Sequence, residues 1–193
     1  MPSIAFHHWS TERAGWLDEI EDAHRSVGGS GPGRRYATQQ INQAYTVLLS
    51  SQFQAFCRDL HLECANSLVS PVSSRERGEM YRSALLLGRK LDRGNPNSGN
   101  LGSDFNRFGL SFWPMVDAYR PQNPYRRALL EELNEWRNAI AHQDFVPAML
   151  RGGRPILQLI QVQGWRRACD RLARSFDGVL YGYISSKTGI APW

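Results

Sequence analysis

Residues 41–64 read INQAYTVLLSSQFQAFCRDLHLEC, and this stretch decides the fold. Its apolar side chains recur every three or four residues, which is the period of one face of an α-helix. Neither glycine nor proline interrupts the sequence between residues 35 and 66, and a proline follows at position 71. The pattern therefore predicts one long helix over residues 35–66. The apolar positions that define its face are Ile41, Tyr45, Leu48, Leu49, Phe53, Phe56, Leu60 and Cys64.

Helical patterns of the same kind lie on both sides of this stretch. Ser73 with Glu76 predicts a capping box, and Asn123 followed by proline predicts another capped helix start. The glycine-rich segment 28–33 predicts a breaker, and residues 151–154 predict the turn of a short hairpin near 150–160. The expected further helices cover residues 9–27, 73–91, 103–113, 123–142 and 165–185.

About five or six helices with almost no strand predict an all-α fold, an up-and-down helical bundle. The length of 193 residues suits a single domain over residues 1–193. We expect its core to lie between residues 9 and 185 and residues 186–193 to form a loose tail.

The composition is that of an ordinary globular protein, with 41% hydrophobic and 21% charged residues. No run of 18 apolar residues is present, so we expect no membrane-spanning helix. Residues 1–8 lack the basic and apolar regions of a secretion signal, and we expect a cytoplasmic protein. Cys57, Cys64 and Cys169 have no paired spacing, which favours buried apolar side chains over disulfides or a zinc site.

The basic residues are almost all arginines. The formal net charge is +5, and 21 of the 23 basic residues are arginines because only Lys90 and Lys187 are lysines. The planar guanidinium group suits phosphate, so this bias agrees with an anionic partner such as RNA. A GC-rich genome, which favours arginine over lysine in every protein, is the alternative explanation.

The segment RNAIAH, residues 137–142, lies late in the predicted helix 123–142. At about 100° per residue, Asn138 and His142 lie about 40° apart and share a face, with Arg137 about 100° from Asn138. The apolar Trp136 and Ile140 anchor the other side of the helix in the core. The helix therefore presents a polar edge of arginine, asparagine and histidine.

These are the groups that RNA cleavage without a metal requires. A base must take the proton of the 2′-hydroxyl and an acid must protonate the leaving 5′-oxygen, and His142 can do either near neutral pH. Arg137 can stabilise the negative charge on the equatorial oxygens of the transition state. Because one chain supplies one such histidine, acid and base together require a second copy at a two-fold interface. The alternative is a purely structural role, in which the helix dipole stabilises a cationic side chain near the C-terminal end of the helix and no catalysis occurs.

The other histidines have less specific surroundings. His7 and His8 lie near the terminus, where we expect a mobile segment. His24 and His61 lie among charged helix neighbours, which predicts solvated side chains.

The spacing of Arg137, Asn138 and His142 resembles the Arg-x4-6-His signature of the HEPN superfamily, in which asparagine commonly follows the arginine. Two further segments resemble the branch called RiboL-PSP-HEPN: residues 48–60, LLSSQFQAFCRDL, and residues 164–173, GWRRACDRLA. The resemblance extends over about residues 35–185.

HEPN membership implies a helical bundle that forms a homodimer and cuts RNA without a metal or other cofactor, leaving a 2′,3′-cyclic phosphate. It also implies a toxin or a phage-defence effector, with RNA as substrate and an antitoxin protein as a partner. Under this resemblance, Arg137 and His142 are the catalytic pair, and Asn138 positions the motif or contacts phosphate. Asp59 and Glu63 are the candidates for the acidic residue that such families add from an earlier helix; the alternative is that both are solvated helix charges.

One position departs from the family pattern. Asp144 stands where some HEPN toxins carry a tyrosine that a partner nucleotidyltransferase modifies, so control by that route is not expected. Two other functions stay open at this point. One is a HEPN module that binds RNA or a protein without cutting, and the other is a structural dimerisation domain without RNA affinity.

Overall fold

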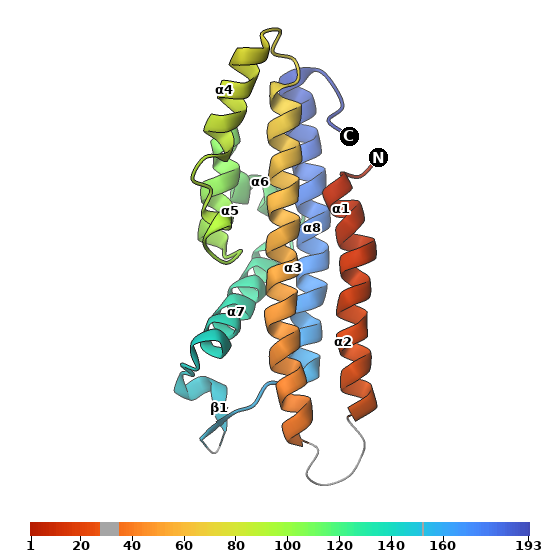
Figure 1. Cartoon of the computed structure of the whole chain (residues 1–193), viewed down its shortest axis with the longest axis vertical. Helices are drawn as coiled ribbons and strands as arrows, with labels where there is room; N and C mark the ends of the chain where they lie inside the picture. Colours follow the sequence, from red (N-terminus) through yellow and green to blue (C-terminus); the bar gives the residue numbers. More distant parts are fainter. Residues whose placement is uncertain (28–34, 152) are drawn as a thin grey trace.

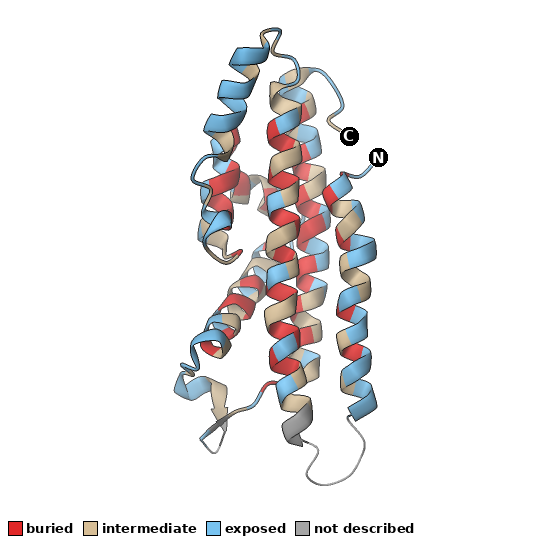
Figure 2. Ribbon diagram, viewed as in Figure 1, coloured by how far each residue is buried: buried red, intermediate tan, exposed pale blue. Residues whose placement is uncertain are grey.

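Two long helices form the centre of the molecule. The computed structural model describes residues 1–27, 35–151 and 153–193. Helix α3 (Arg35–Val69) and helix α8 (Leu159–Thr188) lie side by side through its middle (Figure 1). Buried residues recur at helical spacing along both helices (Figure 2). The helix predicted over residues 35–66 is confirmed, and it continues to Val69.

The remaining helices complete an all-α, up-and-down bundle, as the sequence predicts. The first helical segment runs opposite to α3, on the right in Figure 1. After α3, the chain returns in steps along the other side of that helix before α8 runs parallel to α3 (Figure 1). The first segment comprises α1 (Ile4–His8), a π-helical turn (Trp9–Arg13) and α2 (Ala14–Val27); the returning steps are α4 (Arg75–Leu86), α5 (Ser98–Phe105), α6 (Phe112–Tyr119) and α7 (Asn123–His142).

An aromatic cluster joins these segments in the core. The ring of Phe176 on α8 lies 6.0 Å from that of Phe53 on α3 and 4.9 Å from that of Phe112 on α6, measured between centroids. Phe105 on α5 stacks on Phe112 at 4.5 Å. Because aromatic rings bury large areas, this cluster fixes α5 and α6 against the two central helices.

The predicted helix 103–113 is wrong, because two shorter helices occupy this part of the chain. Helix α5 begins at Ser98, since the side chain of Asn97 accepts a hydrogen bond from the Asn100 backbone N–H at 2.8 Å and caps the helix. The chain then breaks at Gly109, whose φ of 85° is readily adopted only by glycine. Helix α6 starts afresh at Phe112.

Two predicted helix starts also need correction. Ser74, not Ser73, caps α4, and its hydroxyl accepts a hydrogen bond from the Arg77 backbone N–H at 3.4 Å. Asn123 is the first residue of α7 rather than its cap. Its buried side chain instead donates a hydrogen bond to the Val116 carbonyl at 2.7 Å, which ties α7 to α6.

Both ends of the chain lie against the bundle. The expected mobile terminus is helix α1, whose cap Ser3 is buried and accepts a hydrogen bond from the Phe6 backbone N–H. The expected loose tail 186–193 is likewise corrected, since α8 continues to Thr188 and the ring of Trp193 lies 6.1 Å from that of Tyr181. The core therefore begins earlier and ends later than the sequence indicates.

The region around the predicted hairpin contains two very short strands. Strand β1 (Leu150–Arg151) pairs antiparallel with β2 (Arg154–Pro155). Helix α8 then begins at Leu159, six residues before the expected start at Trp165. The predicted breaker over residues 28–33 lies outside the described residues.

None of the described helices combines the length and the apolarity that a bilayer crossing requires.

Cys57, Cys64 and Cys169 are free and buried, as expected, and burial raises the pKa of each thiol. Within the described ranges, His, Cys, Asp and Glu side chains form no group of three or more able to hold a metal ion.

Candidate functional site

Helix α7 places the residues of the Arg137–His142 motif at an exposed helix end. The helix ends at His142 because Gln143 takes a left-handed conformation with φ 55°. The backbone N–H of Asp144 then bonds to the Ala139 carbonyl at 3.0 Å and closes the last turn. The opposite face of α7 holds the helix in place through the buried residues Leu130, Leu133, Trp136 and Ala139.

Asn138 connects Arg137 to a neighbouring loop. The Oδ1 atom of Asn138 accepts a hydrogen bond from Nη1 of Arg137 at 3.1 Å. The same atom accepts a second hydrogen bond from Nδ2 of Asn95 at 3.1 Å. The exposed Asn138 amide therefore orients the half-buried guanidinium group of Arg137. No ion pair neutralises Arg137 within residues 1–27, 35–151 and 153–193, so its charge remains available to an anion.

His142 lies one helical turn beyond Asn138, with an exposed side chain. In the part of the chain that the structure describes, its ring makes no hydrogen bond. The imidazole is therefore accessible to a substrate. The structure thus brings Arg137 and Asn138 together and leaves His142 exposed one turn further along α7. The catalytic assignment of these residues stays a prediction.

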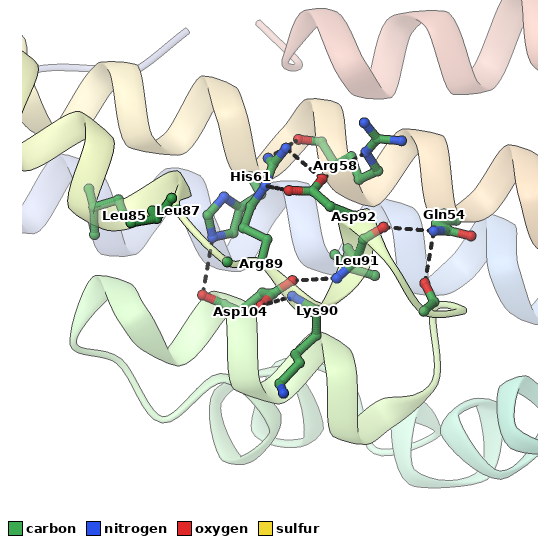
Figure 3. Close-up of polar contacts among 12 residues, drawn as sticks. Gln54, Arg58, His61, Leu85, Leu87, Arg89, Lys90, Leu91, Asp92 and Asp104 are labelled. Atoms are coloured by element: carbon green, nitrogen blue, oxygen red, sulfur yellow. Dashed lines mark hydrogen bonds and ion pairs between the residues drawn. The ribbon is translucent and has the colours of Figure 1, made fainter.

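The loop that carries Asn95 is held rigidly in place (Figure 3). The buried carboxylate of Asp104 accepts hydrogen bonds from the backbone N–H groups of Lys90 and Leu91, both at 2.8 Å. On the other side, Nε2 of Gln54 donates to the carbonyls of Leu91 at 2.7 Å and Gly94 at 2.8 Å. These hydrogen bonds fix the backbone of residues 90–94. They therefore also position the neighbouring Asn95, whose amide donates the hydrogen bond to Asn138.

A surface pocket of about 260 Å³ lies on the same loop. The exposed side chains of Lys90 and Arg93 line it, and neither takes part in an ion pair among the described residues. Sequence reasoning missed both residues, because nothing in their spacing relates them to residues 137–142. The full lining is Gly88, Arg89, Lys90, Arg93, Gly94 and Asn100.

The acidic candidates lie on another face of α3. Asp59 forms an ion pair with Arg13 at 2.6 Å. Glu63 accepts hydrogen bonds from the backbone N–H groups of Ile4 at 3.0 Å and Ala5 at 2.6 Å, and so caps α1. Helices α1 and α2 lie on one side of α3 and α7 on the other (Figure 1). The structure therefore does not join these acids to the motif within one chain, and their assignment to the site stays a prediction.

The expectation that His61 is solvated is wrong. Its ring is fully buried, 4.4 Å from the ring of Phe108 and 5.3 Å from that of Phe105 between centroids. Its Nε2 atom lies 3.1 Å from the carbonyl oxygen of Asp104 (Figure 3). Burial, with smaller effects from the charges of Arg89 and Arg107, lowers the pKa of His61 from 6.5 to about 4. His61 is therefore neutral at pH 7 and belongs to the core.

Comparison of the chain with protein-family models, with curated proteins and with solved structures found no match. The site consists of an exposed histidine, an arginine oriented by an asparagine, and a loop that carries two further cations and is joined to that asparagine through Asn95.

Proposed function

We propose that this chain is a metal-independent endoribonuclease of the HEPN type, with Arg137 and His142 as its catalytic pair. The observation that carries the proposal is that helix α7 carries an exposed His142 and, five residues earlier, a guanidinium group that Asn138 orients and that forms no ion pair within the described residues. An oriented cation without a counter-ion can place its charge on a phosphate.

The reaction would start with attack of the 2′-oxygen on the adjacent phosphorus. One His142 takes the proton from the 2′-hydroxyl, and the second His142 of a dimer gives a proton to the 5′-oxygen as its bond to phosphorus breaks. Arg137 holds the non-bridging oxygens while negative charge gathers on them. The products are a 2′,3′-cyclic phosphate and a free 5′-hydroxyl, so no metal-bound water is needed.

The direct test is incubation of purified protein with RNA in excess EDTA. We expect cleavage products whose 3′ ends carry a cyclic phosphate, and no cleavage of the same RNA when every 2′-hydroxyl is methylated. Cleavage of the methylated strand, or products with 3′-hydroxyl ends, would contradict attack by the 2′-oxygen.

Dilution with an inactive variant tests whether the site is shared between two chains. We mix the unaltered chain with a His142→Ala chain at equal amounts and constant total concentration, and allow the subunits to exchange. If each scissile phosphate needs two copies of His142, activity falls to about one quarter rather than about one half, because only dimers of two unaltered chains can cut.

The matched control for this dilution is a His7→Ala chain, which changes an exposed histidine outside the site. It should leave the activity of the mixture unchanged. A linear fall with the His142→Ala fraction would contradict the shared site.

In the cell, we propose that this activity serves a toxin or a phage-defence effector held in check by an antitoxin protein. A non-catalytic RNA-binding module is the second candidate, favoured by the pocket that Lys90 and Arg93 line and by a motif that supplies one histidine per chain. It predicts RNA binding without product, and binding that is unaffected by His142→Ala.

A further inference from the structure

A second pocket lies between the N-terminal helical segment and α8. It has a volume of about 350 Å³ and follows the π-helical turn Trp9–Arg13. The walls are apolar on one side, where Phe6 and Trp9 contribute, and rich in arginine on the other. Single π-helical turns within α-helices often occur at functional sites. Its lining residues come from the N-terminal helical segment and from α8, and none of them belongs to the Arg137–His142 motif.

Three arginines of α8 form an exposed stripe along this pocket. Arg167, Arg171 and Arg174 are spaced four and three residues apart, so they share one face of the helix. None of the three belongs to an ion pair of the described residues, whereas their neighbour Arg166 is paired with Asp18 at 2.7 Å. The only aromatic contact that the structure gives for these three is that of Arg174, 6.0 Å from the Phe6 ring.

The uncompensated charge continues onto the start of α7. Arg126 donates hydrogen bonds only to neutral groups, at 2.8 Å to Asn123 and 3.2 Å to Gln122. Partial burial, and then the positive charges of Arg171 and Arg120, lower the pKa of Arg126. These guanidinium groups therefore repel one another across two helices, and an anion bound among them would relieve that repulsion.

Two acidic residues of α8, Asp170 and Asp177, lie near the stripe in sequence. The carboxylate of Asp170 lines the pocket and accepts a hydrogen bond from Nε1 of Trp9 at 3.1 Å. Burial raises the pKa of Asp170. Asp177 is turned to the chain terminus, where it accepts a hydrogen bond from the Ser3 backbone N–H at 3.1 Å. Both acids are therefore held by other groups, and the three arginines outnumber the one acid in the pocket.

We propose that Arg167, Arg171 and Arg174 form a binding site for the phosphodiester backbone of an RNA strand, distinct from the Arg137–His142 motif. The stripe is about 10 Å long, which matches about three phosphates of one strand. Guanidinium groups bind phosphate oxygens through paired hydrogen bonds, and an extended polyanion can engage all three at once. The choice of RNA as the polyanion rests on the proposed function.

The test measures binding of a 2′-O-methyl RNA oligonucleotide, which lacks the attacking 2′-hydroxyl. Its affinity is followed by fluorescence anisotropy while the sodium chloride concentration is varied. For the triple variant Arg167→Gln, Arg171→Gln, Arg174→Gln, we expect at least about a tenfold loss of affinity at low salt. The slope of log affinity against log salt should become shallower by about 2, since each lost phosphate contact contributes about 0.7.

Two further triple variants serve as controls. Changing Arg75, Arg77 and Arg82 of α4 to glutamine removes the same charge from exposed positions elsewhere and should leave affinity and slope unchanged. Changing Arg167, Arg171 and Arg174 to lysine keeps the charge, so the slope should stay that of the unaltered chain. If the triple glutamine variant fails to fold, the single variant Arg171→Gln decides the question, since its slope should become shallower by about 0.7.

Three outcomes would overturn the proposal. They are an unchanged slope in the glutamine variant, an equal loss in the α4 control, and competition by a polyglutamate peptide as strong as that by RNA. The last would assign the stripe to an acidic protein. Because the oligonucleotide cannot be cut, none of these results depends on catalysis. Conversely, RNA cleavage that survives His142→Ala would end the assignment of the catalytic pair without affecting the binding result.

Discussion

Replacing His142 by alanine, or Arg137 by alanine, should abolish RNA cleavage in EDTA. Loss of a positioned acid or base costs a factor of about 10² to 10⁴ in rate, and loss of the cation that holds the phosphate has a comparable effect. Both side chains lie at the end of α7 and outside the core, so the fold should survive. Initial rates on a labelled RNA, with circular dichroism to monitor folding, are the measurements.

Matched controls for these substitutions are His7→Ala and Arg77→Ala, which remove an exposed histidine and an exposed arginine from α1 and α4. Their cleavage rates should equal that of the unaltered chain. Cleavage that persists in either motif variant at the rate of its control would refute the catalytic pair.

Lowering the pH from 7 to 4 should cost the folded chain about 3 kcal/mol of unfolding free energy through His61 alone. The pKa of His61 is about 4 in the fold and 6.5 without it. Between pH 6.5 and about 4, His61 is therefore protonated in the unfolded chain and neutral in the folded chain. The stability from the neutral ring is complete above pH 6.5 and is lost as the pH falls to about 4.

The measurement is urea unfolding of the unaltered chain and of a His61→Leu variant across this pH range. The variant isolates the histidine, because the pKa values of Glu63, Asp170 and Asp177 are raised by burial and act in the opposite direction in both chains. The unfolding free energy of the unaltered chain minus that of the variant should fall by about 3 kcal/mol on acidification from pH 7 to pH 4. A constant difference would show that the ring is not held neutral.

The long helices could be predicted from the sequence because their information is local. The apolar period of residues 41–64 requires a helix whatever it packs against, and RNAIAH lies on a helix edge for the same reason. The division of residues 98–119 into α5 and α6 was not foreseen, since it depends on the Asn97 cap and on the left-handed Gly109. Each effect depends on the conformation of a single residue, which the spacing of apolar residues along the sequence does not predict.

Contacts between distant segments account for the other differences. Asp59 and Glu63 look like surface charges in sequence, but the first helix folds back and supplies Arg13 and two backbone N–H groups to them. The neighbours of His61 along the chain include charged residues, while Phe105 and Phe108, which cover its ring, come from beyond α4. The segment that carries Lys90 and Arg93 is joined to the motif by the Asn95–Asn138 hydrogen bond, a contact between residues 43 positions apart in the sequence.

The burial of all three thiols makes this protein convenient for attaching a probe. A raised pKa leaves few thiolates at neutral pH, and enclosed sulfur atoms react slowly with maleimides or methanethiosulfonates. A single Ala141→Cys substitution would therefore provide the one readily labelled sulfur, at an exposed position beside His142, without removal of the native cysteines. Nitroxides attached there would report, by pulsed electron resonance, how far apart two motifs lie when two chains associate.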